Sequence, residues 1–353
     1  YLRRRRGKEP VEYPHPKMRD ILHRTLGIPL FQEHVMRLAE AVGGYTPGQA
    51  DQLRRDMASW RASGKMQRHR ERLLAGMLNN GLSPEFAERI FQQIEGFGSY
   101  GFPESHAAAF ALLAYISAYL KQHYPCEFAC ALLNSQPMGF YNPAVVVNDL
   151  KRHDVRIRPI DIQYSRWDCT VEKGELRLGL RQVKGLSEET GKSIALAREH
   201  GPFQSANDLL RRVNIPSRAL VPLAAAGALR SFSSKRREAI WRASALDPSA
   251  NELLFPLETQ PPPPLATLNL GEMLALDLEY AGSFPTKHPM ELVRAVLTKQ
   301  GVLRAKDLAT ADVTRQATVA GLVITRQRPE SANGAVFITL EDETGQLDVS
   351  LSA

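Results

Sequence analysis

Four consecutive prolines, Pro261 to Pro264, constrain the fold of this chain more than any other feature of its sequence. Proline holds its own φ at about −65° and has no amide proton, so such a run cannot form a helix interior or a central strand. We predict that residues 247–268 form an extended linker. The chain has 353 residues, more than one hydrophobic core usually supports, and the linker divides it into a long and a short segment.

The two segments differ in charge. Residues 1–250 contain 37 Lys and Arg against 25 Asp and Glu, whereas residues 251–353 contain 8 against 13. A basic surplus is what a protein that binds phosphate backbones needs, but a solvated basic surface gives the same count. Charge alone leaves both interpretations open.

The composition also bears on location. Three cysteines in a long chain indicate reduced thiols and predict a cytoplasmic protein. No apolar run is long enough to cross a bilayer, so we expect no membrane partner. The chain begins with Tyr1 and has no signal-peptide core behind the charged run Arg3 to Arg6, so we expect it to be a fragment of a longer protein.

Residues 17–135 have the apolar spacing of a multi-helix domain, interrupted by glycine and proline at several loops. One of these loops leads to Ser105, which we predict to be the N-cap of a helix that ends near His123. That helix is apolar nearly all round, so we expect it to be buried.

The rest of the chain has a different order of elements. Residues 155–180 alternate as short β-strands with a hairpin turn, and helical spacing returns from Glu188 to about Leu246. After the linker, residues 315–351 alternate in three runs, which predicts an antiparallel β meander. The predicted fold is therefore mainly α and multi-domain, with a small antiparallel β domain at its carboxyl end.

Three side chains have a spacing that could bind a metal. His123, Cys126 and Cys130 stand at i, i+3 and i+7, which places them on one helix face. No fourth ligand with Cys-x-x-Cys spacing accompanies them, and Cys169 has no evident partner. Cysteines on an apolar helix usually pack in a core, so we predict no metal site in this chain.

The segment from Val183 to Ser187 precedes an amphipathic helix and resembles a helix-hairpin-helix motif. In that motif a Gly-apolar-Gly turn presents backbone amides at a helix N-terminus to a nucleic-acid phosphate. Gly185 would form the turn, while Ser187 replaces the second glycine and can cap the helix. Lys184 and Lys192 would flank the phosphate. An ordinary helical packing unit is the alternative.

Arg54 and Arg55 follow a Thr-Pro-Gly turn near the start of a predicted helix. Adjacent side chains on a helix point about 100° apart, so two guanidinium groups could embrace a polyphosphate. A pair of solvated surface charges is the commoner outcome. The spacing does not decide between the two.

Four collinear stretches resemble one family. Residues 12–57, 97–135 and 177–213 are similar to the fingers and helix-hairpin-helix regions of bacterial C-family DNA polymerases, which include the replicative DNA polymerase III alpha subunit. Residues 318–351 are similar to the OB-fold strands of that family. The sequence FGSYGFPESHAAAFALLAY favours the error-prone, mutagenesis-associated subfamily, the ImuC type.

The resemblance implies a domain order, from fingers to a partial OB fold. Residues 1–154 would be polymerase fingers, and residues 155–246 a β-hairpin with a helix-hairpin-helix DNA-binding region. Residues 247–268 would be a linker with a candidate clamp-binding peptide. Residues 269–353 would hold connecting helices and a truncated OB fold.

The resemblance also implies roles for single residues. In this family an arginine pair after the fingers turn contacts the triphosphate of the incoming nucleotide, and Arg54 and Arg55 match it. Ser105 and His106 match a segment near the nascent base pair. Palm aspartates hold two divalent metal ions, and we expect them before Tyr1. We therefore expect the Mg²⁺ ligands to lie outside this chain, and no polymerase activity from this chain alone.

Residues 250–255 lie where the family carries a sliding-clamp-binding peptide, which starts with Gln and ends in apolar residues. Asn251 departs from that pattern, whereas Leu253, Leu254 and Phe255 supply the apolar end. We expect weak binding to the clamp, or recruitment through an accessory mutagenesis protein. A linker that merely packs its leucines explains the same residues.

The function that the resemblance implies is translesion DNA synthesis in damage tolerance, with primer-template DNA and deoxynucleoside triphosphates as partners. Two alternatives stay open. One is the replicative polymerase III alpha subunit. The other is a non-catalytic DNA-binding module with a helix-hairpin-helix and an OB fold.

Overall fold

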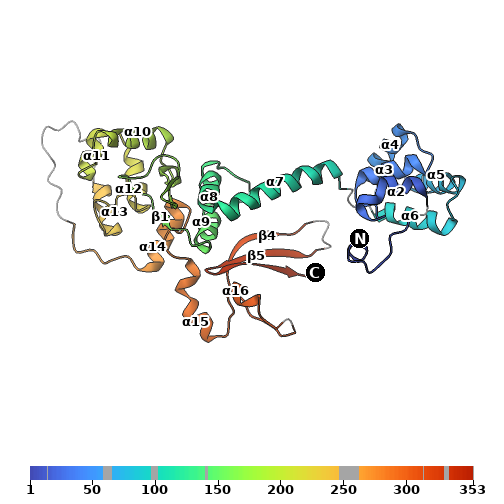
Figure 1. Ribbon diagram of the computed structural model, residues 1–353. Helices are drawn as coiled ribbons and strands as arrows, with labels where there is room; N and C mark the ends of the chain where they lie inside the picture. Colours follow the sequence, from blue (N-terminus) through green and yellow to red (C-terminus); the bar gives the residue numbers. More distant parts are fainter. Residues whose placement is uncertain are drawn as a thin grey trace. The chain divides into compact units, whose positions relative to one another are not determined.

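The computed structural model describes residues 1–13, 15–58, 66–96, 102–139, 142–245, 262–312, 314–329 and 334–352. The described chain is mainly α with a small β region, as predicted (Figure 1). Packing divides it into two compact units, residues 1–118 and residues 119–353. This division lies earlier in the chain than the boundary at residue 154 that the sequence suggests.

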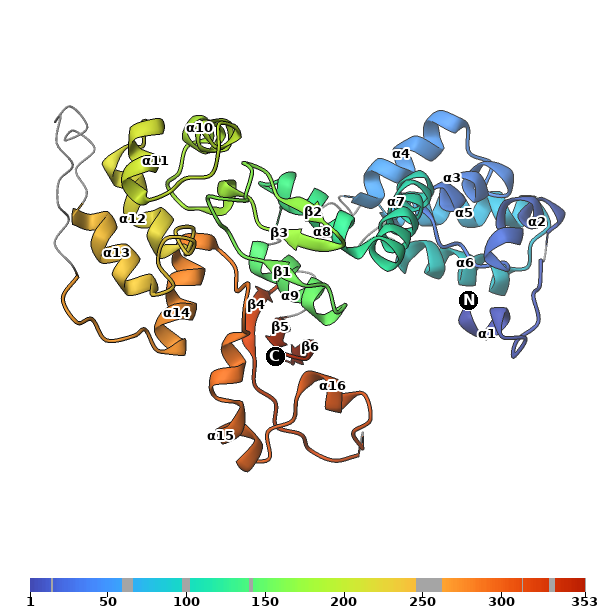
Figure 2. The same cartoon turned by 60° about the vertical axis from the view of Figure 1, so that its left-hand side comes forward.

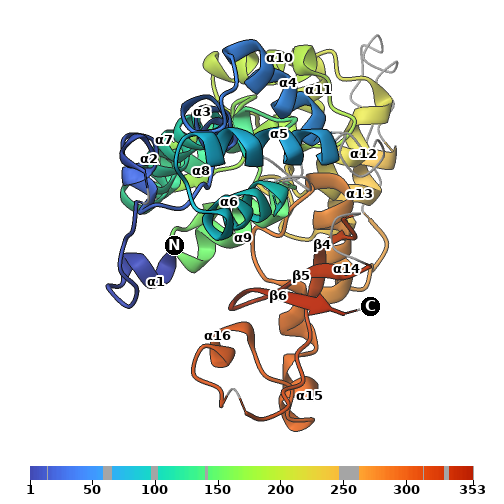
Figure 3. The same cartoon turned by 90° about the vertical axis from the view of Figure 1, so that its right-hand side faces the viewer.

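Unit 1 is a cluster of short helices around one core (Figure 3). The α3–α5 packing places two backbones in direct contact, because a β-carbon on Gly76 would lie 2.0 Å from the carbonyl oxygen of Gly43. Ala50, Leu53 and Met57 recur at helical spacing on α4 and are fully buried, so α4 presents its opposite face to solvent. The helices are α1 (Leu2–Arg5), α2 (Pro16–Leu22), η1 (His23–Thr25), α3 (Gln32–Ala41), α4 (Pro47–Ala58), α5 (Met66–Asn79) and α6 (Pro84–Gly96).

Helix α7 (Glu104–His123) begins in unit 1 and contains the boundary between the units. Two predictions about it are wrong. Ser105 lies inside the helix instead of at its N-cap, because the backbone N–H of Glu104 already donates to the Glu33 carboxylate at 2.8 Å. The helix is also not buried, since none of its residues is enclosed by the described cores. Its exposed large apolar side chains are Phe110, Leu112, Leu113, Tyr115, Ile116, Tyr119 and Leu120.

Unit 2 has one large core, which explains where the boundary falls. Helices α8 (Pro125–Asn134) and α9 (Pro143–Arg152) pack against the β-hairpin and the helices that follow it, so residues 119–154 join this core. The helices that follow are η3 (Leu180–Gln182), α10 (Glu188–Glu199), α11 (Ala206–Arg212), α12 (Ser217–Ala225) and α13 (Arg236–Ala245), as seen in Figure 2.

The hairpin is part of a three-stranded sheet in the order β1-β3-β2. Strands β2 (Thr170–Glu172) and β3 (Glu175–Arg177) pair antiparallel, and β1 (Ile157–Arg158) pairs parallel to β3. Lys173 and Gly174 make the turn at φ values of 55° and 79°. Such values suit a tight two-residue hairpin turn, so the predicted hairpin is confirmed.

Residues 262–268, the described part of the predicted linker, contain no helix or strand. The chain then forms α14 (Leu270–Leu276), the π-helical η5 (Asp277–Ala281), η6 (Pro289–Leu292), α15 (Arg294–Lys299) and α16 (Ala305–Leu308). Strands β4 (Leu322–Gln327), β5 (Val336–Asp342) and β6 (Gly345–Leu351) pair antiparallel in that order, which confirms the predicted meander. No helix in the described ranges is long and apolar enough to span a bilayer.

A buried carboxylate attaches this meander to the helices. The Glu341 side chain on β5 is 1% exposed and accepts hydrogen bonds from Asn148 at 3.1 Å and Arg152 at 3.0 Å, both on α9. Burial raises the pKa of Glu341, but the nearby His288 ring and the hydrogen bonds from Asn148 and Arg152 outweigh it and lower the pKa below its usual value. A carboxyl group with a lowered pKa stabilises the fold above its unfolded-state pKa and ceases to do so at lower pH.

We predict that Glu341→Gln lowers the free energy of unfolding by about 3 kcal/mol at pH 7, because the buried ion pair is lost. The difference from the unsubstituted chain should narrow as the pH falls from the ordinary glutamate pKa, about 4.3, down through the lowered pKa of Glu341 in the folded state. Urea unfolding followed by circular dichroism at several pH values measures both effects. Glu199→Gln, at an exposed position on α10, serves as the control. An unfolding difference that stays constant with pH would contradict the assignment.

Candidate nucleotide-binding and DNA-binding sites

The arginine pair lies on the solvent face of α4, where both side chains reach the same carboxylate. Arg54 Nε donates to Asp51 Oδ1 at 2.9 Å, and Arg55 Nη2 donates to Asp51 Oδ2 at 2.5 Å. The side chains of Arg54 and Arg55 are 40% and 64% exposed. Although adjacent helical positions diverge, the two guanidinium groups therefore converge on one point.

Asp51 holds the two guanidinium groups close together, in positions from which they could bind an anion. Hydrogen bonds from Arg54 and then Arg55 lower the pKa of the Asp51 carboxyl, so it stays ionised at neutral pH. Two cations around one carboxylate leave an excess of one positive charge on an accessible surface. A phosphate group can therefore replace the carboxylate or join it, because each guanidinium has further N–H donors.

A hydrogen-bonded chain joins α5 to α4 beside the arginine pair, and the sequence did not reveal it. His69 Nδ1 lies 3.1 Å from Tyr45 Oη, and His69 Nε2 lies 3.0 Å from Asp56 Oδ2. The Arg72 guanidinium stacks over the Tyr45 ring at 4.7 Å. Burial raises the pKa of Tyr45 to about 12. These residues line a cavity of about 320 Å³, and no regular spacing links them in the sequence.

Ser105 and His106 are exposed on the first turn of α7. The His106 ring packs against Phe102 at 5.4 Å and against Phe110 at 4.4 Å between centroids. Within the described ranges, no hydrogen bond or ion pair joins Ser105 or His106 to the arginine pair. Their predicted place near a nascent base pair stays a prediction.

The candidate DNA-binding hairpin has the predicted turn. Gly185 has φ of +86°, which residues with side chains rarely adopt, and it lies in open space. Ser187 caps α10, because its hydroxyl accepts from the backbone N–H of Thr190 at 3.2 Å. The backbone N–H of Lys184 donates to the carbonyl of Tyr280 at 2.9 Å, which fixes the turn to η5.

The two lysines of this hairpin differ. The Lys184 side chain is exposed, and no ion pair of it occurs in the described residues. Lys192 is paired with Glu188 at 2.6 Å, one helical turn earlier on α10. The first helix of the hairpin is reduced to the single turn η3. Lys184 is therefore the better placed cation for a backbone phosphate.

The cysteines lie in the core of unit 2, as the packing interpretation predicted. Burial raises the pKa of Cys126 and of Cys169 to about 11, and it also raises the pKa of Cys130. His123 is exposed, away from that core. Across the described ranges, no group of three or more His, Cys, Asp or Glu side chains could hold a metal ion. The residues Leu253, Leu254 and Phe255 lie outside the described part of the chain.

Two parts of the sequence, each containing one of these candidate sites, match known protein families. Residues 1–81 match the bacterial DNA polymerase III alpha subunit finger domain, and residues 154–239 match the helix-hairpin-helix motif. The first match contains the arginine pair of α4, and the second contains the hairpin at Gly185. Residues 1–81 are therefore similar to a domain of the bacterial DNA polymerase III alpha subunit.

Relatives that align with nearly the whole chain are all error-prone DNA polymerases in the comparisons described next. An error-prone DNA polymerase of Pseudomonas paraeruginosa is 47% identical over 357 residues, which cover 99% of this chain and 35% of the relative. An error-prone DNA polymerase of Alkalilimnicola ehrlichii is 49% identical over 357 residues, which cover 99% and 34%. The chain spans about a third of the length of the curated relatives it matches. Nearly the whole chain is thus similar to about a third of a bacterial error-prone DNA polymerase.

We predict that all three cysteines resist a thiol reagent at pH 8 in the folded chain, because all three are buried and their pKa values are raised. For Cys126 and Cys169, a pKa of about 11 leaves roughly one thiolate in a thousand. All three should react in urea. Absorbance after addition of an aromatic disulfide measures the number and the rate. Fast reaction of any cysteine in the folded chain would contradict the core packing described above.

Proposed function

We propose that this chain is the part of an error-prone bacterial DNA polymerase that binds the incoming nucleotide and the primer-template DNA. The observation that carries the proposal is the agreement between relatives and geometry. The relatives align with 99% of the chain, and the accessible arginine pair falls in the residues that match the finger domain. The activity of the whole protein would be template-directed DNA synthesis in damage tolerance.

In this proposal Arg54 and Arg55 bind the triphosphate of the nucleotide. The support is their convergence on Asp51, which positions two guanidinium groups around one anion before any ligand arrives. Neutralising the charge on a transferring phosphoryl group is the main task of a protein in phosphoryl transfer. Ser105 and His106 would lie close to the paired base.

Lys184, Gly185 and Ser187 would hold the DNA backbone. The exposed glycine turn and the capped start of α10 offer backbone N–H groups and a free lysine to a phosphate. Lys192 would contribute once its pairing with Glu188 is relaxed by DNA. Such contacts are independent of base sequence and weaken as salt rises.

Further parts of the proposal rest on the resemblance. The peptide with Leu253, Leu254 and Phe255 would recruit a sliding clamp or an accessory mutagenesis protein, and the protein would act in the cytoplasm. Mg²⁺ would be the metal of the reaction. The described residues do not form a ligand set for it, so we derive no metal-dependent step from this chain.

We predict that Arg54→Ala and Arg55→Ala each weaken deoxynucleoside triphosphate binding about tenfold, because each removes a charge-assisted hydrogen bond. The measurement is calorimetric titration of the 353-residue chain in the presence of primer-template DNA. Arg24→Ala, at an exposed position of η1 in the same unit, should leave the affinity unchanged.

The same variants separate the enzyme from its main alternative. If Arg54→Ala and Arg55→Ala changed only DNA affinity and its dependence on salt, a non-catalytic DNA-binding module would be the better explanation. An unchanged affinity for both ligands would remove the arginine pair from the proposal.

We predict that Lys184→Gln weakens DNA binding and reduces the slope of log affinity against log salt by about one, because one phosphate contact is lost. Fluorescence anisotropy of a labelled duplex over a salt series gives the slope. Lys299→Gln, which makes the same charge change at an exposed position of α15, is the control. Equal slopes for Lys184→Gln and the unsubstituted chain would exclude Lys184 as a phosphate contact.

A further inference from the structure

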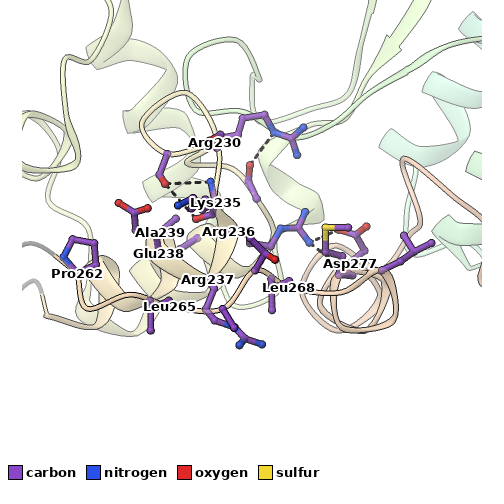
Figure 4. Close-up of a pocket in the computed structure, with 18 of the residues that line it drawn as sticks. Arg230, Lys235, Arg236, Arg237, Glu238, Ala239, Pro262, Leu265, Leu268 and Asp277 are labelled. Atoms are coloured by element: carbon purple, nitrogen blue, oxygen red, sulfur yellow. Dashed lines mark hydrogen bonds and ion pairs between the residues drawn. The ribbon is translucent and has the colours of Figure 1, made fainter.

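A large cavity lies in unit 2, and none of its lining residues belongs to the Gly185 hairpin. Its volume is about 710 Å³, within the range of pockets that hold small organic ligands. One wall is the loop between α12 and α13 with the first turn of α13, and the facing wall is the extended segment 262–268 (Figure 4). The first wall lies within the residues that match the helix-hairpin-helix motif, but the function proposed above assigns no ligand contact to either wall.

The cavity is rich in cations. Five of its lining residues are basic and two are acidic. The five basic residues are Arg230, Lys235, Arg236, Arg237 and Lys287, and the two acidic residues are Glu238 and Asp277. The surplus of positive charge indicates an anionic ligand.

Three of these cations already have a carboxylate partner. Arg236 binds the buried Asp277 at 2.7 Å, Arg237 binds Glu272 at 2.7 Å, and Lys287 lies 3.9 Å from Glu291. Glu238 is not available to the other two cations, since it binds Arg242 at 2.7 Å. Within the described ranges, Arg230 and Lys235 have no carboxylate within 4.0 Å.

Arg230 is also held beside a like charge. The Nη2 atoms of Arg230 and Arg236 lie 3.0 and 2.6 Å from one point, the place where a β-carbon on Gly227 would be. Gly227 has φ of +75° and no side chain, so both guanidinium groups can lie over its backbone. Arg230 Nε donates only to the Gly227 carbonyl, at 3.0 Å. Desolvation, followed by the charge of Arg236, lowers the pKa of the Arg230 guanidinium.

The guanidinium groups of Arg230 and Arg236 lie side by side, but only Arg236 forms an ion pair with a carboxylate. Asp277 forms its ion pair with Arg236, whereas Asp161 and Asp277, the two carboxylates that attract the Arg230 charge, make no contact with Arg230 within 4.0 Å. A phosphate group placed between Arg230 and Lys235 would bring negative charge into direct contact and accept hydrogen bonds from both side chains.

The facing wall is apolar. Leu265 and Leu268 are half-buried and line the cavity together with the described prolines of the linker, opposite the cations (Figure 4). An inorganic anion alone would leave this wall exposed to water. A ligand with a phosphate at one end and a flat ring at the other would contact both walls.

We propose that this cavity is a second nucleotide site, in which Arg230 and Lys235 bind the phosphates and the Leu265–Leu268 wall covers the base. Its volume suits one nucleotide and excludes a DNA duplex. The site is independent of the arginine pair on α4, because it is built from residues of unit 2 alone.

Calorimetric titration of the 353-residue chain with ADP tests the proposal. Arg54→Ala and Arg55→Ala are introduced first, so that any nucleotide bound by unit 1 does not contribute. In this background ADP should bind at one site, and Arg230→Gln with Lys235→Gln should weaken the affinity by roughly a hundredfold, about tenfold for each cation. Arg230→Lys keeps the charge and should retain part of the affinity.

Arg211→Gln provides the control, because it removes one charge from an exposed position of α11 outside the cavity and should leave ADP binding unchanged. Circular dichroism and thermal unfolding establish that each variant is folded. A labelled single-stranded oligonucleotide is titrated in parallel.

The outcomes are distinct. Loss of ADP binding in the cavity variants alone supports the proposal. It is overturned if ADP does not bind, if the cavity variants bind it as well as their parent, or if only oligonucleotide binding responds, since the cations would then serve a nucleic-acid strand.

Discussion

The attachment of the carboxyl-terminal meander to α9 depends on one buried charge. Glu341 lies on the middle strand of a three-stranded sheet, and the donors that α9 presents help it to stay ionised away from water. Arg152 and Asn148 are almost two hundred positions earlier in the chain. This interaction fixes the register of β5 in the sheet, because a shift of one residue would leave a charge buried without a partner.

Basic residues occur in three settings in this protein, and their partners separate them. Arg152 is enclosed and paired, and serves the fold. Arg54 and Arg55 are paired but accessible, so their shared carboxylate holds them in place without closing the site. Arg230 is crowded by a like charge and has only a backbone acceptor. Net charge cannot distinguish these settings, because it counts all of them equally.

Local sequence patterns predicted much of the fold. The β2–β3 turn, the cap at Ser187 and the three-stranded meander all depend on neighbours within a few positions, and all were confirmed. The Tyr45–His69–Asp56 chain and the pairing of Glu341 with Arg152 were not foreseen, because they join residues brought together only by tertiary packing. The arginine pair was found, but its convergence on Asp51 depends on side-chain rotamers.

Helix α7 shows the opposite failure. Its composition indicates burial, whereas none of its residues is buried and many of its large apolar side chains are exposed in the described chain. The inference from an all-apolar helix to burial assumes that the covering residues are present. The N-cap prediction failed for a related reason. The first backbone N–H of α7, that of Glu104, donates to the Glu33 carboxylate of α3, a residue distant in sequence, and not to the serine.

The contact between Gly76 and Gly43 determines how unit 1 can vary. Two backbones touch there with no side chain between them, so a methyl group at Gly76 would separate α5 from the α3–α4 loop. A methyl group at Gly43 would instead lie 2.7 Å from the Leu73 side chain and 2.8 Å from the Ala39 carbonyl oxygen. Tyr45 and His69 lie on the two sides of this contact. In a mutational scan, these two glycines would be as intolerant as a binding residue while touching no ligand, and their intolerance would report on the helix packing of unit 1.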